Sequence, residues 1–103
     1  MNKLLPFFTN ETTKHKIMNG KFVLIRTYSA GVHFGTMISR EGQEVHLSNA
    51  RRLWSWSGAL SLSEIASKGI DLKNSKVSVP VDEIILTQAI EIIPISKASN
   101  LPS

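Results

Sequence analysis

The stretch GVHFGTMISREGQEVHLSN at residues 31–49 predicts a β-hairpin. Apolar side chains alternate with other residues along its first half, and the alternation resumes after the loop REGQ. Gly42 suits the left-handed backbone position of a short hairpin loop. Gly35 interrupts the first strand, which predicts a bulge or a sharp bend there. A bend of this kind lets a short sheet curl toward a barrel.

The period of two continues on both sides of the hairpin. Before it, KFVLIRTYS at 21–29 predicts a strand that is buried on at least one side, and the dipeptide AG at 30–31 permits a tight bend into the hairpin. After it, NARRLWSWSG at 49–58 extends the second hairpin strand. We therefore expect three consecutive strands in a meander.

A short helix is expected next, in SGALSLSEIASKG at 57–69. Ser61 and Glu64 have the spacing of a capping box, and Gly69 stands where a helix can end. The polar sequence IDLKNSKVSVP at 70–80 then predicts a loop.

The β-branched run at 81–96 predicts one or two closing strands, with a bulge or a turn at 88–89. The chain thus divides into an N-terminal arm at 1–20, a single small domain at 21–96 and a C-terminal tail at 97–103. Strong curvature in so short a domain predicts a mainly β (α+β) fold, a small SH3-like or Sm-like curved β-barrel with one short α-helix.

The net charge of +4 is unevenly distributed along the 103 residues. Residues 1–79 hold eleven Lys and Arg against five Asp and Glu, whereas residues 80–103 hold one against three. The basic part favours an anionic partner or is merely solvated. Because a chain of this length builds only a modest core, we also expect a homo-oligomer.

The sequence contains no cysteine, which excludes a disulfide framework, a thiolate metal site and a cysteine nucleophile. No segment approaches the roughly 18 apolar residues of a membrane span. The start MNKLLPFFTNETTKHK breaks at Pro6 and turns polar, unlike a signal peptide. We expect a cytoplasmic protein with no membrane partner.

Catalytic chemistry has little support in the sequence. His15, His33 and His46 lack the spacing of metal ligands. Asp82 and Glu83 are adjacent, so in a strand they point to opposite faces and do not form a working carboxylate pair. We therefore expect a binding protein that has no catalytic residues, no metal and no cofactor.

The sequence ARRLWSWS at 50–57 is the first candidate for binding. If it is extended, Arg52, Trp54 and Trp56 share one face, and the other face carries Arg51, Leu53 and Ser55. Indole rings stack on bases and guanidinium groups pair with phosphate, which predicts a site for a small nucleotide or for single-stranded nucleic acid. The alternative is that at least one of the two tryptophans belongs to the core.

The sequence RTYSAGVH at 26–33 is the second candidate. The bend after Ser29 exposes backbone N–H groups and hydroxyls that can hold an anion. As alternatives, Tyr28 is an edge aromatic, His33 faces solvent, and Arg26 pairs with Glu44. The candidate ligand-binding residues of both stretches are Arg26, Tyr28, Ser29, Gly31, His33, Arg51, Arg52, Trp54 and Trp56.

The run RTYSAGVHFGTMISREGQEVHLSNARRLWSWSGALSLSEIASKG, followed by VDEIILTQAIEIIP, resembles an uncharacterised family of small tailed-phage and prophage proteins. The resemblance covers about residues 21–95, and the matching positions include all nine candidate residues. The family has no assigned reaction. The resemblance implies a phage accessory protein made in the cytoplasm of the infected bacterial host.

One class of phage accessory protein of this size sequesters the nucleotide second messengers of bacterial immune systems, typically as compact oligomers. By analogy, we expect a sponge-type inhibitor of anti-phage defence that binds a nucleotide-derived signal without converting it. Two alternatives stay open. One is a nucleic-acid-binding module of phage replication or expression, and the other is a phage structural or host-protein-binding component.

Overall fold

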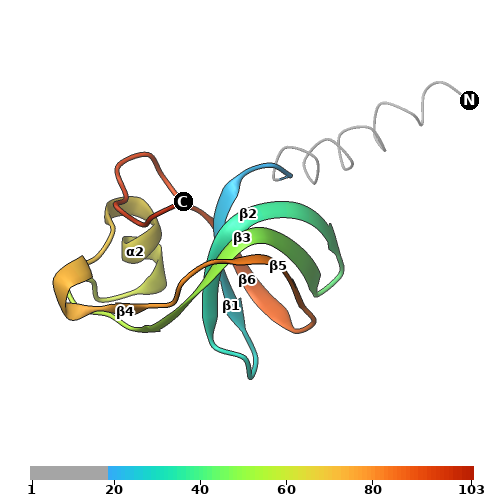
Figure 1. Ribbon diagram of the computed structural model, residues 1–103, viewed down its shortest axis with the longest axis horizontal. Helices are drawn as coiled ribbons and strands as arrows, with labels where there is room; N and C mark the ends of the chain where they lie inside the picture. Colours follow the sequence, from blue (N-terminus) through green and yellow to red (C-terminus); the bar gives the residue numbers. More distant parts are fainter. Residues whose placement is uncertain (1–18) are drawn as a thin grey trace, which may run out of the picture.

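The computed structural model describes residues 19–103, so all but the last two residues of the expected arm lie outside the described part. The described chain forms one antiparallel sheet with a short helix beside it (Figure 1). Its elements are β1 (Phe22–Thr27), β2 (Val32–Glu41), β3 (Glu44–Ser55), α2 (Leu62–Lys68), the 3₁₀ helix η1 (Leu72–Asn74), β4 (Lys76–Val77), β5 (Val81–Leu86) and β6 (Ala89–Pro94). The predicted mainly β fold with one short α-helix is confirmed.

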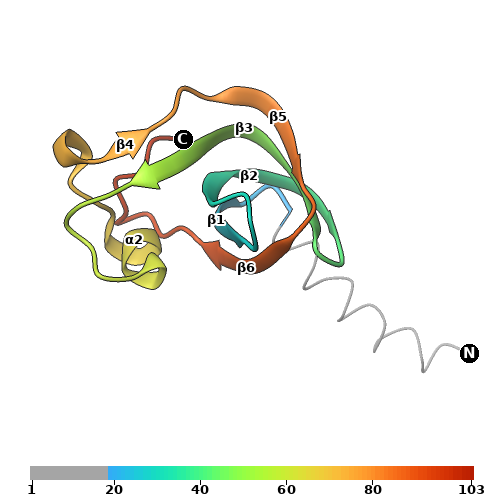
Figure 2. The same cartoon turned by 90° about the horizontal axis from the view of Figure 1, so that it is seen from below.

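The strand order is β4-β3-β2-β1-β6, and β5 also pairs with β3. The long strand β3 has two partners on one side, because Val45 to Ala50 pair with β5 whereas Leu53 and Ser55 pair with β4. The sheet is curled, and β5 and β6 lie close to each other near the short turn that joins them (Figure 2). The pairings of residues 19–103 include none between these two strands, so the curled sheet is not closed into a barrel.

The predicted hairpin forms with Gly42 in a left-handed turn at φ 59°. The bend expected at Gly35 is also present, but the extra residue is on β3. The register jumps there, and Asn49 adopts a left-handed φ of 51° opposite Gly35. A Cβ on Gly35 would lie 3.0 Å from Cα of Ala50 and 3.0 Å from the carbonyl oxygen of Ser48. Glycine therefore permits the close approach of the two strands at the bulge.

Both faces of the sheet are buried at β1, where three consecutive residues are buried. Val23 and Ile25 belong to a cluster inside the curl of the sheet, which we call the interior cluster. Leu24, between them, belongs to a second cluster formed with α2, which we call the helix-side cluster. The other buried members of the interior cluster are Met37, Val45, Leu47, Ala50, Leu86 and Ala89. Those of the helix-side cluster are Phe34, Leu53, Ile65, Ala66, Ile70 and Leu101.

The helix begins and ends where the sequence predicts. Ser61 is the N-cap, and its hydroxyl accepts a hydrogen bond from the backbone N–H of Glu64. The Glu64 carboxylate accepts in turn from the N–H of Leu60. Gly69 ends the helix with a φ of 92°. Ile65 is buried, so this short helix is stabilised by packing on the sheet as well as by its caps.

Two segments are more ordered than the sequence predicts. The expected loop at 70–80 contains η1 and β4. The expected tail at 97–103 forms no helix or strand, but Leu101 is buried in the helix-side cluster. The side-chain amide of Asn100 also donates to the carbonyl of Ile70 and accepts from its N–H. The C-terminal segment is therefore part of the folded domain. The turn expected at 88–89 is present between β5 and β6, but it consists of residues 87–88, because Ala89 is already part of β6.

Candidate ligand-binding site

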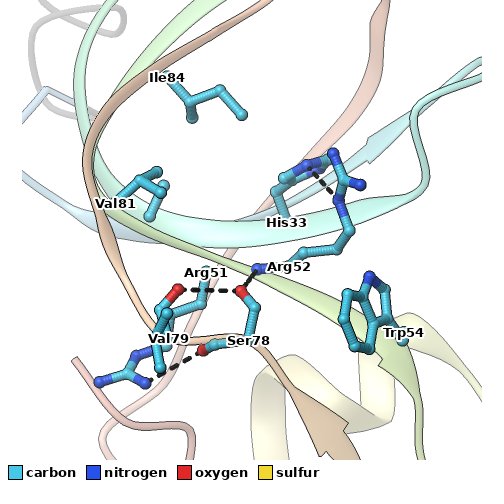
Figure 3. Close-up of a pocket in the computed structure, with 9 residues that line it drawn as sticks. His33, Arg51, Arg52, Trp54, Ser78, Val79, Val81 and Ile84 are labelled. Carbon is cyan, nitrogen blue, oxygen red and sulfur yellow. Dashed lines mark hydrogen bonds between the residues drawn. The ribbon is translucent and has the colours of Figure 1, made fainter.

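A groove of about 240 Å³ opens where β3 changes partner from β5 to β4. Its walls come from β2, β3, β5 and the connection between β4 and β5 (Figure 3). We call it the β3 groove. Four of the nine candidate residues line it: His33, Arg51, Arg52 and Trp54.

Arg52 is fixed in the groove at its backbone and at its side chain. The backbone N–H of Arg52 donates to the Ser78 hydroxyl at 2.8 Å, and the N–H of Ser78 donates to the Arg52 carbonyl at 2.9 Å. The side-chain Nε–H of Arg52 donates to Nε2 of His33 at 3.2 Å (Figure 3). Within residues 19–103, its Nη1 and Nη2 groups have no hydrogen-bond partner, and no carboxylate lies within ion-pair distance.

His33 lies opposite Arg52 on the neighbouring strand and is only 1% exposed. The burial of the ring, together with the nearby Arg52 charge, lowers the pKa of His33 from 6.5 to about 4. The ring is therefore neutral at pH 7. Because a guanidinium can only donate, Nε2 accepts and the proton resides on Nδ1. Nδ1 is buried and has no partner among the described residues. The expectation of a solvent-facing His33 is wrong.

Arg51 reaches the groove from the other side of β3. It pairs with the buried Phe34, and its Nη1 donates to the Ser78 carbonyl at 3.3 Å. Its Nε is buried and has no partner in residues 19–103. The carbonyl and the hydroxyl of Ser78 thus contact the two neighbouring arginines, which fixes the loop after β4 against β3.

The two tryptophans lie in different environments: Trp54 lines the groove with Arg52, as expected, but Trp56 does not. Trp54 occupies a bulge, because the register between β3 and β4 shifts between Leu53 and Ser55. Its side chain is 64% exposed and lines the groove. Trp56 follows the end of β3, where the alternation stops, and it packs against the helix-side cluster. Trp56 is the tryptophan that belongs to the core.

The other four candidates lie around the turn between β1 and β2 and do not line the groove. Arg26 pairs with Glu91 of β6, with Nε 3.0 Å from Oε1, so the alternative pairing with Glu44 is wrong. Tyr28 is 78% exposed. The Ser29 hydroxyl donates to the side chain of Gln88 at 2.8 Å. The remaining candidate of this turn is Gly31, whose φ is 85°.

The groove also contains residues that the sequence does not mark. Ser78 and Val79 come from the segment predicted as a loop, and Val81 and Ile84 come from β5. The alternation within β5 separates its two faces, but no local pattern shows that β5 pairs with β3. These residues reach the groove only through that long-range pairing.

The remaining polar contacts of the sheet include one between histidine and carboxylate. Nε2 of His46 lies 2.8 Å from Oε1 of Glu83, across the pairing of β3 and β5. Within residues 19–103, no three His, Asp or Glu side chains come together as ligands for a metal ion. The same part of the chain has no helix with the length and apolar character needed to cross a membrane.

A family model described as a domain of unknown function (DUF6948) matches residues 20–101. The search of curated proteins and the search of solved structures gave no match.

Proposed function

We propose a function for this chain, which belongs to the family described as a domain of unknown function (DUF6948): it is a phage accessory protein that sequesters a nucleotide-derived immune signal. It acts in the cytoplasm of the infected bacterial host, and it holds the ligand in the β3 groove without converting it. The family description assigns no reaction, so the proposal rests on the sequence and on the chemistry of the groove.

The observation that carries the proposal is the pairing of Arg52 with Trp54 in one groove. A nucleotide combines an anionic phosphate with a flat aromatic base. The Nη groups of Arg52, which have no partner among residues 19–103, suit the phosphate, and the exposed indole of Trp54 suits the base. Both groups come from β3, so the rigid sheet fixes their separation.

The charge around the groove also favours an anionic ligand. Arg51 and Arg52 are adjacent and both line it. In residues 19–103, the basic side chains that contact a carboxylate are Arg26, with Glu91, and His46, with Glu83, so no carboxylate of these residues neutralises either groove arginine. Two uncompensated guanidinium groups beside an apolar wall attract a phosphate more strongly than solvated surface charges do.

The size of the groove supports a homo-oligomer. Its volume of about 240 Å³ lies below the roughly 300–1,000 Å³ of most small-molecule sites. Exposed apolar side chains at its border, Trp54, Val79 and Val81, are available for contact with another subunit. We therefore include in the proposal a second copy of the chain that covers the bound ligand.

The test is to incubate the purified full chain with a panel of cyclic oligonucleotides and ADP-ribose derivatives, and to measure depletion and recovery by mass spectrometry. We expect stoichiometric depletion of at least one compound and release of the intact molecule on denaturation. Arg52→Ala and Trp54→Ala should abolish depletion. The controls Arg40→Ala and Tyr28→Ala change an exposed arginine and an exposed aromatic residue outside the groove and should retain depletion. Recovery of a cleaved product would instead identify an enzyme.

A nucleic-acid-binding module is a second candidate, because an arginine beside an exposed indole also suits single-stranded nucleic acid. It predicts affinity that rises with oligonucleotide length and falls steeply with salt. A structural or host-protein-binding component is the third candidate, and the exposed apolar border of the groove favours it. In that case Trp54→Ala changes the oligomeric state, and no nucleotide is depleted.

We also propose that the fold is an SH3-like or Sm-like half-barrel. The meander of β1 to β3 and the return of β6 to β1 support this relationship. An experimental structure tests it, and hydrogen bonds between β5 and β6 would make the barrel complete. A flat sheet with β5 and β6 far apart would contradict it.

A further inference from the structure

The guanidinium of Arg52 has a hydrogen-bond partner at Nε, and within residues 19–103 it has none at its two Nη groups. A guanidinium pairs with a phosphate either through Nε and one Nη or end-on through its two Nη groups. Nε of Arg52 already donates to Nε2 of His33. A phosphate can therefore pair with Arg52 only end-on, through the N–H groups of Nη1 and Nη2.

We infer that His33 is a positioning residue, which holds Arg52 so that the β3 groove selects one phosphorylated nucleoside unit, with its phosphate on Arg52 and its base on Trp54. This inference rests on the proposed function and deepens it. It assigns a separate role to each of His33, Arg52 and Trp54, and it names the part of the ligand that one groove binds.

The burial of His33 supports this role. The ring is 1% exposed and leaves Nδ1 buried without a partner in residues 19–103, which destabilises the folded state. An apolar ring of similar size would avoid that penalty, but it would leave Nε of Arg52 without an acceptor. What the imidazole provides in this position is a neutral ring nitrogen that accepts from Arg52.

The rigidity of Arg52 supports selection rather than mere attraction. Its backbone N–H and carbonyl both form hydrogen bonds with Ser78, and its Nε donates a hydrogen bond to His33. Few rotatable bonds remain to be fixed when a phosphate binds, which increases affinity by preorganisation. Exposed arginines elsewhere, such as Arg40, carry the same charge without a buried acceptor of this kind.

The spacing in β3 supports a single nucleoside unit. Arg52 and Trp54 are two residues apart, which is roughly 7 Å along an extended strand. One ribose joins a base to its 5′-phosphate, so a single unit spans the two side chains. A cyclic oligonucleotide would place one of its units in each groove of an oligomer.

The experiment is isothermal titration calorimetry of the full chain with two matched pairs of probes, adenosine 5′-monophosphate with adenosine and guanosine 5′-monophosphate with guanosine. The measured quantity is the Kd of the nucleoside divided by the Kd of its nucleotide. We expect at least about a tenfold ratio for one pair with the native chain, as befits a charge-assisted bidentate contact. Arg52→Ala should reduce the ratio to about one.

Variants of His33 separate positioning from a structural role. His33→Phe should lower the ratio several-fold while the affinity for the nucleoside is unchanged. His33→Gln, whose amide oxygen can accept from Nε of Arg52, should restore most of the ratio. The matched control is His46→Phe, which removes the histidine that contacts Glu83 and should leave the ratio unchanged. If His33→Phe weakens both ligands equally, positioning is overturned.

Arg52→Lys keeps the test decisive if His33→Phe does not fold. Lysine keeps the charge but lacks the planar fork, and the side chain is exposed, so the variant should fold and its ratio should fall. An unchanged ratio overturns the inference. Equal affinity of the native chain for nucleoside and nucleotide also overturns it but leaves the proposed function standing, provided that the panel of signalling nucleotides is depleted. Failure of that panel overturns both.

Discussion

Trp54 and Trp56 are two residues apart in the sequence, but one lines the β3 groove and the other packs against the helix-side cluster. The bulge at Trp54 and the end of β3 at Ser55 separate them. A stretch that suggests one aromatic surface therefore divides into a side chain available to a ligand and a side chain that stabilises the fold.

This division predicts unequal effects of the two substitutions to alanine on stability. Trp56→Ala removes a partly buried indole and should lower the free energy of unfolding by roughly 2–3 kcal/mol, below the range for a fully buried tryptophan. Trp54→Ala should change it by less than about 0.5 kcal/mol, because the side chain is 64% exposed. Urea unfolding measures both values. Equal losses of stability would contradict the assignment of Trp54 to a ligand surface.

The buried His33 predicts a pH dependence of stability. Its pKa is about 4 in the folded chain and 6.5 when unperturbed, so between these values the unfolded state binds more protons. The contribution of His33 to the free energy of unfolding should be fully present above pH 6.5. It should be lost as the pH decreases toward 4, by on the order of 3 kcal/mol. Urea unfolding at pH 7 and at pH 4.5 tests this. His33→Gln should lose most of the dependence, whereas a slope equal to that of the native chain would assign it to other groups.

Gly35→Ala should destabilise the sheet. Its new Cβ would lie 3.0 Å from backbone atoms of Ala50 and Ser48, which cannot move without disturbing the bulge in β3. We expect a loss of roughly 1–3 kcal/mol, typical of overpacking. The control is Gly42→Ala, which has open space around it and only the cost of a left-handed φ of 59°. Thermal unfolding that ranks the control as the more damaging change would argue against the close approach.

Leu101→Ala tests whether the C-terminal segment belongs to the domain. Leu101 is 6% exposed and contacts the helix-side cluster, so truncation should lower the free energy of unfolding by about 2 kcal/mol or more. Lys97→Ala, in the exposed part of the same segment, should have almost no effect. A negligible change for Leu101→Ala would mean that the segment behaves as the tail expected from its sequence.

Local patterns predicted most of the secondary structure. Alternation marked β1 to β3, the Ser61 and Glu64 spacing marked α2, and a short break marked the turn between β5 and β6. These features depend on neighbours within a few residues. The order of the C-terminal segment was missed because it depends on contacts between Asn100 and Ile70, thirty residues apart.

The candidate site was predicted only in part, for the same reason. Arg52 and Trp54 were assigned to one face because their spacing is local. The separation of the turn residues Arg26 and Tyr28 from the groove depends on the pairing of β1 with β6. The entry of Ser78 into the site depends on its hydrogen bonds to Arg52, twenty-six residues earlier in the chain.

The sequence alone therefore determined the mainly β meander, the capped helix and the presence of cationic and aromatic side chains together in β3, since these follow from periodicity and local hydrogen bonding. Only the tertiary structure decided which of those side chains share a groove. Burial makes His33 a neutral acceptor for Arg52, the bulge exposes Trp54, and the second cluster encloses Trp56. Each of these outcomes depends on contacts between distant segments that the sheet brings together. The alternation of residues within one strand does not predict such contacts.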